Sequence, residues 1–327
     1  MTTSVPPEAD WDQAPGLLTG AKTLELSAER CNLGYWLTAV AQGTLRGRAV
    51  TGHADAPVPD FMREPGPLRE ALILELGHRS VAEEKATRIL AHYVANAPGI
   101  PEMEFYATQL IDEARHSKVF RDHLVELGVP AGELHATIAE LSRDYTREVL
   151  DPVEEFAVRI VRDQGDFIGG VVVFTIVIEG VLAPAAELSE RKWDRLDPAA
   201  SEIARGAAID EIRHLTVGSS IIRDHLVRHP EYRPRLREIL VAGRELWDAV
   251  PDRKYVMHRE ELFQQGMREQ AGLLHDYEVW PGRLLLDTTA EERYDIAERW
   301  TDEMAESRMA FMDLTDALPL LSSGTAA

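Results

Sequence analysis

The sequence contains a single cysteine among its 327 residues, Cys31. One cysteine cannot form a disulfide, a cysteine-ligated zinc site or an iron–sulfur cluster within one chain. Basic residues are also scarce, since 35 Lys and Arg stand against 56 Asp and Glu and give a formal net charge of −21. Such a surface repels nucleic acid, anionic membranes and acidic proteins. We therefore expect neither a nucleic-acid partner nor a membrane partner.

Targeting and membrane-spanning signals are lacking as well. The N-terminus has no basic region followed by an apolar run, so it does not resemble a signal peptide. Residues 167–186 alone are apolar and long enough to cross a membrane, and they include Glu179. A carboxylate in mid-membrane would cost about 2.5–3.5 kcal/mol or more. The favoured interpretation is the buried helix of a soluble, cytoplasmic protein.

No run of alternating β-branched residues predicts a sheet, and no Gly-rich dinucleotide fingerprint follows a strand. Helical periodicity runs through most of the chain instead, which predicts an all-α fold. We expect a flexible N-terminal segment over residues 1–20, a single helical domain over 21–315 and a mobile tail over 316–327. The predicted helices span residues 24–45, 67–96, 101–128, 153–161, 167–188, 197–230, 233–249, 253–278 and 290–314, with a turn at 280–282.

One internal repeat is present. The segments Asp112–Val125 and Asp210–Val227 share the patterns DE-x-RH and RDHLV, with four more residues between the patterns in the second copy. Four residues are about one helical turn, so the helix face is nearly kept. Each copy places a Glu and a His three residues apart, and residues at this spacing share one face of a helix. The repeat predicts four metal ligands: Glu113, His116, Glu211 and His214.

Two further carboxylates complete the set. Glu179 is the only charged residue in the most apolar stretch of the chain and lies 32 residues before the carboxylate of the second pair. By analogy the first half should supply a Glu about as far before Glu113, and Glu83 and Glu84 lie 30 and 29 residues before it. On a helix, Glu83 falls at the edge of the apolar face and Glu84 nearly opposite. We therefore prefer Glu83 as the ligand, with Glu84 as the alternative.

An isolated buried carboxylate is costly or stays protonated, whereas beside a metal ion its charge is offset. Four carboxylates and two imidazoles suit iron or manganese better than structural zinc. A metal-bound His usually donates its other N–H to a carboxylate or carbonyl. Asp112 and Asp210 are candidates for this role, each crossing to the His of the other helix. Gln109, one turn before Glu113, could hydrogen-bond a ligand carboxylate, although an ordinary packed Gln is the alternative.

This set of residues resembles the ferritin-like non-haem di-iron carboxylate proteins, over about residues 70–230. The doubled DE-x-RH is most similar to the oxygenase and desaturase branches. The whole chain more loosely resembles the valanimycin-pathway di-iron N-oxygenase group. The resemblance implies a four-helix di-iron bundle with additional N- and C-terminal helices, which holds two iron ions, or manganese in their place.

Departures from the family narrow the choice within it. Phe120 stands where ribonucleotide reductase small subunits usually place a radical Tyr, which argues against a reductase role. Monooxygenases and desaturases carry a Thr about one turn after the third Glu, and here the nearby residues are Leu182 and Ala183. Thr175, one turn before Glu179, is the only hydroxyl on that helix, so the usual dioxygen-assisting Thr is in doubt.

The resemblance implies an O2-dependent monooxygenase that acts on a small organic substrate. N-oxygenation of an amine or hydrazine in natural-product (antibiotic) biosynthesis is the leading specific reaction, and C-hydroxylation or desaturation is the alternative. A non-catalytic metal-binding protein that retains the ligands is the alternative from another class. An external electron donor, such as a ferredoxin or flavin reductase, is expected because no flavin or iron–sulfur motif is present, and a homodimer is the habit of the family. The expected pocket-lining residues are Leu110, Phe120, Val172, Thr175 and Ile176.

Overall fold

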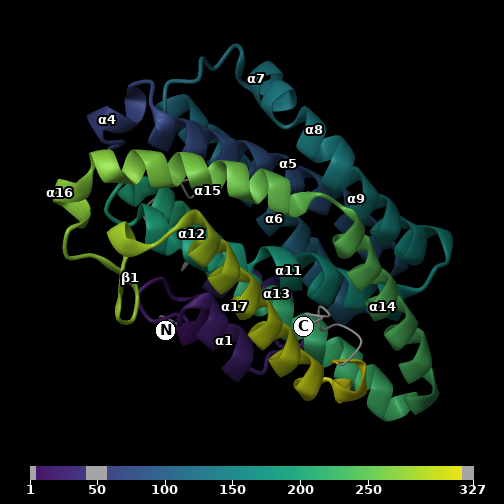
Figure 1. Ribbon diagram of the computed structural model, residues 1–327. Helices are drawn as coiled ribbons and strands as arrows, with labels where there is room; N and C mark the ends of the chain where they lie inside the picture. The colour runs from purple at the N-terminus through teal and green to yellow at the C-terminus, as the bar shows by residue number, and fades with distance from the viewer. Residues whose placement is uncertain (1–4, 42–56, 319–327) are drawn as a thin grey trace, which may run out of the picture.

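The structure, a computed structural model, describes residues 5–41 and 57–318, and this part of the chain is almost entirely helical (Figure 1). The expected all-α fold is confirmed. The two strands in the described residues, β1 (Glu278–Trp280) and β2 (Arg283–Leu284), form a small antiparallel hairpin. Its turn lies at the predicted position, and Gly282 takes a φ of +77° there, which glycine adopts without strain.

Four long helical stretches form the central bundle. They are α5 (Pro67–Asn96), α6 (Ile100–Glu126), the composite stretch α10 (Phe167–Val172), η6 (Val173–Ile178), α11 (Glu179–Leu182) and α12 (Pro184–Trp193), and α13 (Pro198–Arg228). Helix α5 packs along α6, and α13 packs against α6, α10 and α12. Most of the composite stretch is thereby buried inside the protein.

Local signals set where the bundle helices begin. Pro67 and Pro101 lie in the first turns of α5 and α6, where a missing N–H costs nothing. The Asp197 side chain accepts a hydrogen bond from the Ala200 N–H at the start of α13, and Pro198 is the first residue of that helix. These starts lie at or within one residue of those expected from the sequence.

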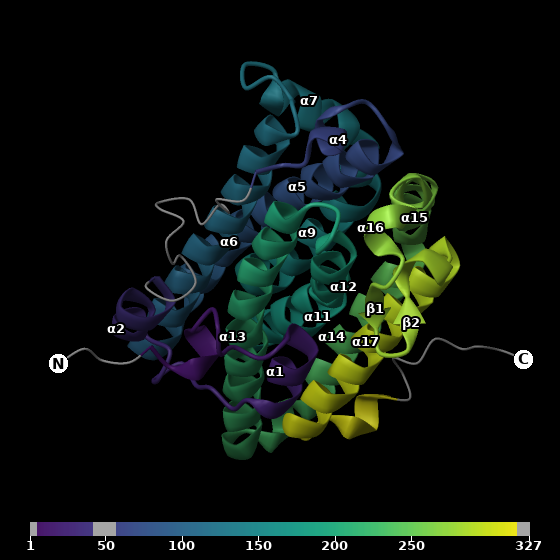
Figure 2. The same cartoon turned by 90° about the vertical axis from the view of Figure 1, so that its left-hand side faces the viewer.

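Further helices surround the bundle. They are α1 (Leu17–Thr23), α2 (Leu33–Tyr35), α4 (Asp60–Arg63), α7 (Leu134–Leu141), α8 (Arg143–Tyr145), α9 (Asp151–Val158), α14 (Arg233–Ala249), α15 (Asp252–Glu269), α16 (Ala271–Leu274) and α17 (Ala290–Phe311). Short 3₁₀ turns are η1 (Pro7–Ala9), η7 (Pro230–Tyr232), η8 (Leu285–Asp287) and η9 (Thr315–Ala317), and π-helical segments besides η6 are η2 (Trp36–Val40), η4 (Thr146–Leu150) and η5 (Arg159–Asp163). Helices α15 and α17 pack on one another and lie on the opposite side of the bundle from α6 (Figure 2).

The two ends of the chain differ from expectation. Residues 5–20 were expected to be flexible, but Ala9 and Leu17 are fully buried and α1 packs against α13 and α17. The helix predicted over residues 24–45 begins only at Leu33, where the Asn32 side chain caps it by accepting from the Tyr35 N–H. Ala317, in the expected mobile tail, is also buried. Residues 1–4, 42–56 and 319–327 lie outside the described part.

The composite stretch Phe167–Trp193 is long and apolar enough to cross a membrane, with a mean hydropathy of 2.2 in its most apolar window. However, 83% of that window is buried inside the protein, as expected for a core helix. The stretch was predicted as one regular helix, but its centre is π-helical. The Glu179 N–H donates to the carbonyl of Phe174, five residues back, so the turn before Glu179 is wider than an α turn.

Candidate metal centre

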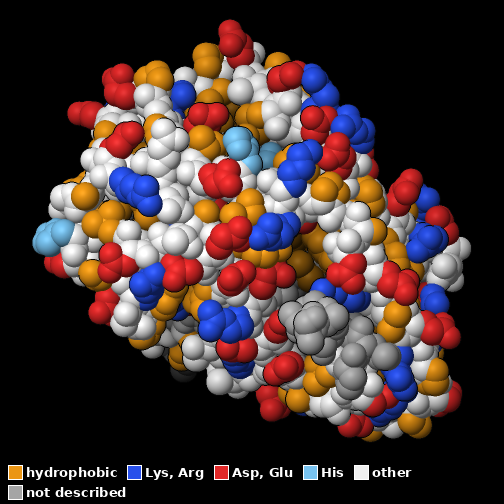
Figure 3. All heavy atoms as spheres, in the orientation of Figure 1, with side chains coloured by type: hydrophobic (Ala, Val, Ile, Leu, Met, Phe, Trp, Pro, Cys, Tyr) orange, Lys and Arg blue, Asp and Glu red, His pale blue; other side chains and the backbone are white. Residues whose placement is uncertain are grey.

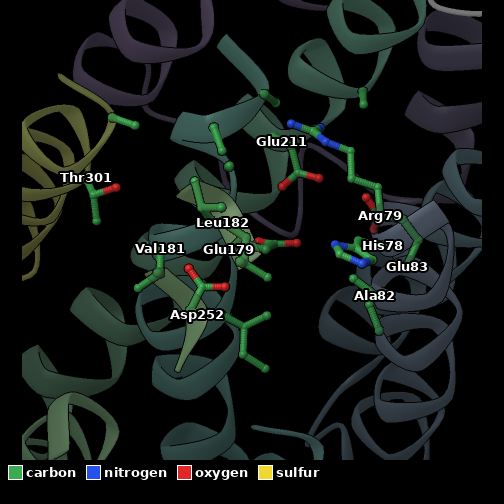
Figure 4. A pocket seen from close by; sticks show the side chains of 18 of the residues that line it. His78, Arg79, Ala82, Glu83, Glu179, Val181, Leu182, Glu211, Asp252 and Thr301 are labelled. Atoms are coloured by element: carbon green, nitrogen blue, oxygen red, sulfur yellow. The ribbon is translucent and has the colours of Figure 1, made fainter. Parts of the chain in front are cut away.

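All four stretches of the bundle direct ligand-type side chains to one point. Glu113, Glu179, Glu211 and His214 form one group whose potential ligand atoms all lie within 4.8 Å of one another. Glu83, Glu113 and His116 form a second group by the same measure. Glu113 belongs to both groups, so the two are adjacent. Figure 4 shows Glu83, Glu179 and Glu211 approaching one another from different helices.

The two imidazoles present equivalent atoms to the centre. His116 Nδ1 lies 3.3 Å from Glu113 Oε2. His214 Nδ1 lies 3.2 Å from Glu113 Oε1 and 3.3 Å from Glu179 Oε1. The i, i+3 spacing within α6 and α13 accounts for this, because it places each Glu and its His on the same helix face.

Of the two residues left open by the sequence, Glu83 lies in the cluster and Glu84 does not. Glu84 points to solvent and pairs with Arg88, one turn further along α5, at 2.7 Å. A helix turns by about 100° per residue, and this rotation directs the Glu83 side chain to the cluster and the Glu84 side chain to solvent.

The two aspartates of the repeat lie against the histidines of the opposite helix. Asp210 Oδ2 is 3.1 Å from His116 Nε2, and Asp112 Oδ2 is 3.5 Å from His214 Nε2. A carboxylate at Nε2 favours the proton on that nitrogen and leaves the Nδ1 lone pair for the centre. The crossed contacts thus fix both the orientation and the tautomer of each ring.

Basic side chains compensate these aspartates. Arg115 pairs with Asp210, and Arg213 pairs with Asp112. Burial acts to raise the pKa of Asp112, but Arg213 and His214 outweigh it and hold that pKa well below its usual range. Trp36 Nε1 also donates to Asp112 Oδ1 at 3.0 Å. Nothing in the sequence pattern pointed to Trp36, which reaches the site from the N-terminal segment.

Gln109 contacts a ligand carboxylate directly. Its Nε2 donates to Glu179 Oε1 at 2.6 Å, from the helical turn before Glu113. Because Gln109 is buried and lies on α6, it holds the Glu179 side chain across the interface between α6 and α11.

Three carboxylates of the centre, Glu179, Glu83 and Glu113, are hard to ionise. Burial, reinforced by the nearby Glu211, raises the pKa of Glu179 to about 7. Glu83 is partly exposed as a residue, yet burial of its carboxyl still raises its pKa to about 7. The pKa of Glu113 is raised well above its usual value by burial and by its neighbours Glu211 and Glu83.

The pKa values of the two histidines shift in opposite directions. Burial, together with Arg115, lowers the pKa of His116 well below its usual value, so this ring is neutral. Burial also acts to lower the pKa of His214, but Glu179, Asp112 and Glu113 outweigh it and raise that pKa.

The residues present fit a metal ion. Four buried atoms of the cluster have no hydrogen-bond partner in the described part of the chain: Glu113 Oε1, Glu179 Oε2, Glu211 Oε2 and His214 Nδ1. In that same part, no Lys or Arg forms an ion pair with any of the four ligand carboxylates. Unpaired buried charge is strongly unfavourable, and a divalent cation relieves it. These buried groups can therefore hold a metal ion, and their overlap at Glu113 is compatible with a di-iron site.

A cavity of about 160 Å³ adjoins the cluster. Glu83, Glu113, Glu179 and Glu211 form part of its wall, and much of the remainder is apolar. Helices α5, α11, α12, α15 and α17 enclose it, and Figure 3 shows a hollow with hydrophobic side chains where α11, α15 and α17 meet. The apolar lining consists of Ala82, Ala86, Phe174, Ile178, Val181, Leu182, Ala183, Ala185, Ala186, Val256, Ala207 and Ala297.

None of the five residues expected to line a pocket lines this cavity. Val172 and Ile176 lie in one apolar core cluster with Leu110 packed against it, and Phe120 lies in another. Thr175 packs against α13 so closely that a Cβ at Gly218 would clash with its hydroxyl. For Thr175 and Ile176 the reason is the π turn. It places Phe174, five residues before Glu179, on the cavity side, whereas α-helical spacing favoured Thr175 and Ile176.

The polar side of the cavity was missed from the sequence. It carries His78 and Arg79 from α5, Tyr145 from α8, and Asp252 and Arg259 from α15. Arg79 stands one turn before Glu83, which is a weak signal for a residue near the site. The residues of α15 offered no signal, because only packing brings them to the cluster.

No protein-family model matches the chain, and no curated protein matches it either. The fold and the site alone define its class. It is an all-helical protein whose central bundle encloses a buried carboxylate and histidine cluster compatible with a di-iron site.

Proposed function

We propose that the protein is an O2-dependent non-haem di-iron oxygenase that acts on a small organic substrate. The observation that carries the proposal is the pair of ligand groups that share Glu113, have no basic partner in the described residues, and border a cavity of about 160 Å³. A purely structural cluster would need neither the uncompensated charge nor the adjoining space.

Four carboxylates and two imidazoles are hard and borderline ligands, which favour iron or manganese. We propose iron, held by Glu83, Glu113, His116, Glu179, Glu211 and His214. Two iron ions bound there would supply the electrons and the Lewis acidity that activate dioxygen. In the monooxygenase reaction, one oxygen atom enters the substrate and the other leaves as water, at the expense of two electrons and two protons.

The side chains of the protein have definable tasks in this reaction. Asp210 and Asp112 retain the protons on the Nε2 atoms of the two histidines and keep each Nδ1 directed at the centre. Gln109 orients Glu179 through the hydrogen bond to its Oε1. The alanine-rich cavity wall excludes water from the substrate and strengthens electrostatic interactions at the centre.

N-oxygenation of an amine or hydrazine in natural-product biosynthesis is the specific reaction that we propose. Its support is the resemblance to the valanimycin-pathway N-oxygenase group. The electrons come from a separate protein or reductant, because one cysteine cannot hold an iron–sulfur cluster.

The proposal is tested by measuring iron per chain and then mixing the anaerobic Fe(II) protein with dioxygen in a stopped-flow spectrometer. We expect two irons per chain and a transient visible absorption band whose decay is faster when an amine is present. A slow drift to a stable product that no amine, hydrazine or hydrocarbon alters would contradict catalysis. The Glu84→Ala variant is the matched control, since Glu84 faces solvent beside the ligand Glu83.

A further inference from the structure

Two arginines face the cavity without adequate partners. Arg79 of α5 and Arg259 of α15 both line it, and their side chains are only 18% and 15% exposed. Their nearest carboxylate is Glu75, at 3.8 Å from Arg79 and 3.7 Å from Arg259, which is too far for a hydrogen bond. Arg259 Nε is buried and has no hydrogen-bond partner in the described residues.

Glu75 is already engaged by other groups. Ser189 donates to it, Trp193 Nε1 donates at 3.3 Å, and Lys192 Nζ lies 3.5 Å away. Several cations therefore share one carboxylate. The pKa of Glu75 is held far below its usual range, because Lys192 and the two arginines outweigh the effect of burial.

The charges around Glu75 do not balance. The connected ion pairs comprise two carboxylates and four cations, an excess of two positive charges (4 − 2): Glu75, Glu260, Lys192, Arg293, Arg79 and Arg259. A buried excess of this kind is unfavourable unless an anion compensates it. Lys192 and Arg293 share Glu260, whereas Arg79 and Arg259 share Glu75, so one of the two excess charges lies on the arginines that face the cavity.

Two further carboxylates line the cavity, Asp252 of α15 and Glu298 of α17, and in the described residues neither forms an ion pair with Arg79 or Arg259. Asp252 lies two helical turns before Arg259, and in the described part of the chain it forms no ion pair with Arg259. Its side chain shares a hydrogen bond with Tyr145, and burial raises the pKa of Asp252 despite Arg259. The hydrogen bond with Tyr145 and the charge of Arg259 both act to lower this pKa, so burial alone weakens the negative charge of Asp252.

A neutral imidazole lies beside the arginines. His78 stacks on Tyr145 with 4.4 Å between ring centroids, and burial lowers its pKa to about 3. His78 Nδ1 is buried and has no hydrogen-bond partner among the described residues. Figure 4 shows His78 and Arg79 on the side of Glu83 and Glu211, with Asp252 and Thr301 across the cavity.

We propose that this cavity binds a small carboxylic acid, whose carboxylate lies on Arg259 and Arg79 and whose short apolar body lies against the alanine-rich wall beside Glu179. The planar guanidinium fork matches a carboxylate in shape and charge. A cavity of about 150 Å³ accommodates benzene, so the 160 Å³ present here suits a molecule of that size. The inference names the substrate class of the oxygenase proposed above and rests on that function only for the reaction that follows binding.

The test uses three probes of the same shape: 3-methylbutanoate, 3-methylbutylammonium and 3-methylbutan-1-ol. Each is titrated calorimetrically into the iron-loaded protein without dioxygen. We expect the carboxylate to bind at least about tenfold more tightly than the other two. We expect Arg259→Met and Arg79→Met each to weaken its binding by about 10- to 100-fold, since each removes charge-assisted hydrogen bonds.

Two further variants serve as controls for the arginine substitutions. Arg253→Met is the matched control on the same helix, because Arg253 is exposed and pairs with Glu291, and it should bind the carboxylate unchanged. Arg259→Lys keeps the charge but loses the fork, so it should fold even if Arg259→Met does not and should bind more weakly than the native protein. Circular dichroism and iron content establish that each variant is folded and loaded.

Two results would overturn the inference. One is native-like binding of 3-methylbutanoate by folded, iron-loaded Arg259 and Arg79 variants, as expected if the acid binds iron alone. The other is preferred binding of the ammonium probe that Asp252→Asn abolishes. Oxygen consumption by the Fe(II) protein is measured separately. Carboxylate binding without oxygen consumption would refute the oxygenase and leave the binding site intact, and the reverse result would refute only the binding site.

Discussion

Two groups of charged side chains are buried in this protein, and they differ in how the charge of their buried carboxylates is compensated. The compensated cluster, which consists of Glu75, Glu260, Lys192 and Arg293, joins α5 and α12 to α15 and α17. Its carboxylates have basic side chains within ion-pair distance. The metal centre has four carboxylates and, in the described residues, no Lys or Arg paired with them.

The pKa values express the difference. Lys192 and Arg293 outweigh burial and lower the pKa of Glu260, whereas burial and Glu211 raise the pKa of Glu179 to about 7. All these carboxylates are buried, so burial by itself does not distinguish a structural cluster from a metal centre. The two kinds of site differ in whether basic side chains of the chain lie beside the carboxylates. Where no basic side chain does, a metal ion must provide the positive charge.

The largest expected effect is that of Glu113→Ala. Because Glu113 belongs to both ligand groups, its loss should abolish binding at both positions. Iron per chain should fall from two toward zero, with a loss of affinity greater than the roughly 100-fold typical of an outer hydrogen-bond partner. Elemental analysis after dialysis measures this. Glu84→Ala should retain both ions. Equal iron content in the Glu113→Ala and Glu84→Ala variants would show that Glu113 is not a metal ligand.

The next largest effect is expected for Lys192→Met, a substitution in the compensated cluster. It removes the cation that Glu75 and Glu260 share, but Glu260 keeps Arg293, so the cost should not exceed about 3 kcal/mol, the lower end of the cost of breaking a buried pair from one side. Urea unfolding should show this loss with iron content unchanged. Lys118→Met is the control, because the exposed pair of Lys118 with Asp122 is worth about 0–1 kcal/mol. A cost below that of the control would mean that the compensated cluster does not depend on its cations.

The pH dependence of the metal-free protein should differ between the clusters. The folded-state pKa of Glu179, about 7, lies above its ordinary value of 4.5, so the folded state holds this proton more tightly. The free energy of unfolding should therefore fall as pH rises from about 4.5 to 7, by roughly 1–3 kcal/mol for this group. The lowered pKa of Glu260 acts in the opposite sense, with stability lost as pH falls.

Urea unfolding of the chelator-treated protein at pH 5 and pH 8 checks this sign. Glu179→Gln cannot ionise at that position, so it should lose less stability over this range than the native chain. If both proteins lose the same amount, Glu179 is not the carboxylate that resists ionisation.

The smallest expected effect is that of Gln109→Met. It removes one hydrogen bond to Glu179 while keeping the volume of the side chain. Iron affinity should fall by about 3- to 10-fold, and the stability of the compensated cluster should be unchanged. Competition with a chelator measures the affinity. Undiminished affinity would show that Glu179 is positioned by packing alone.

Much of the fold followed from local signals. The predicted helix over residues 67–96 coincides with α5, because a proline start and a 3.6-residue apolar period suffice to define it. The π segment η6 did not follow, since the apolar run of this stretch is equally compatible with a regular α-helix. Helix α7 and the hairpin β1–β2 were likewise missed, because they are short and depend on their neighbours.

The candidate site was likewise predicted only in part from the sequence. The i, i+3 spacing is enough to group Glu113 with His116 and Glu211 with His214. Helix phase favoured Glu83 over Glu84, and Glu83 is the one in the cluster. Phe174 lines the cavity in place of Thr175 and Ile176, because the π turn rotates the helix just before Glu179.

Local sequence was thus sufficient to establish which side chains share a helix face and that the chain is helical, because both depend on residues within a few positions of one another. Packing of the helices decided which faces meet and which charges compensate each other. Arg79 and Arg259 are 180 residues apart in sequence (259 − 79), yet they face one cavity. No local sequence pattern predicts that these two arginines lie together, because their proximity depends on the packing of α15 on α5. The same packing decides which buried carboxylates have no cation beside them.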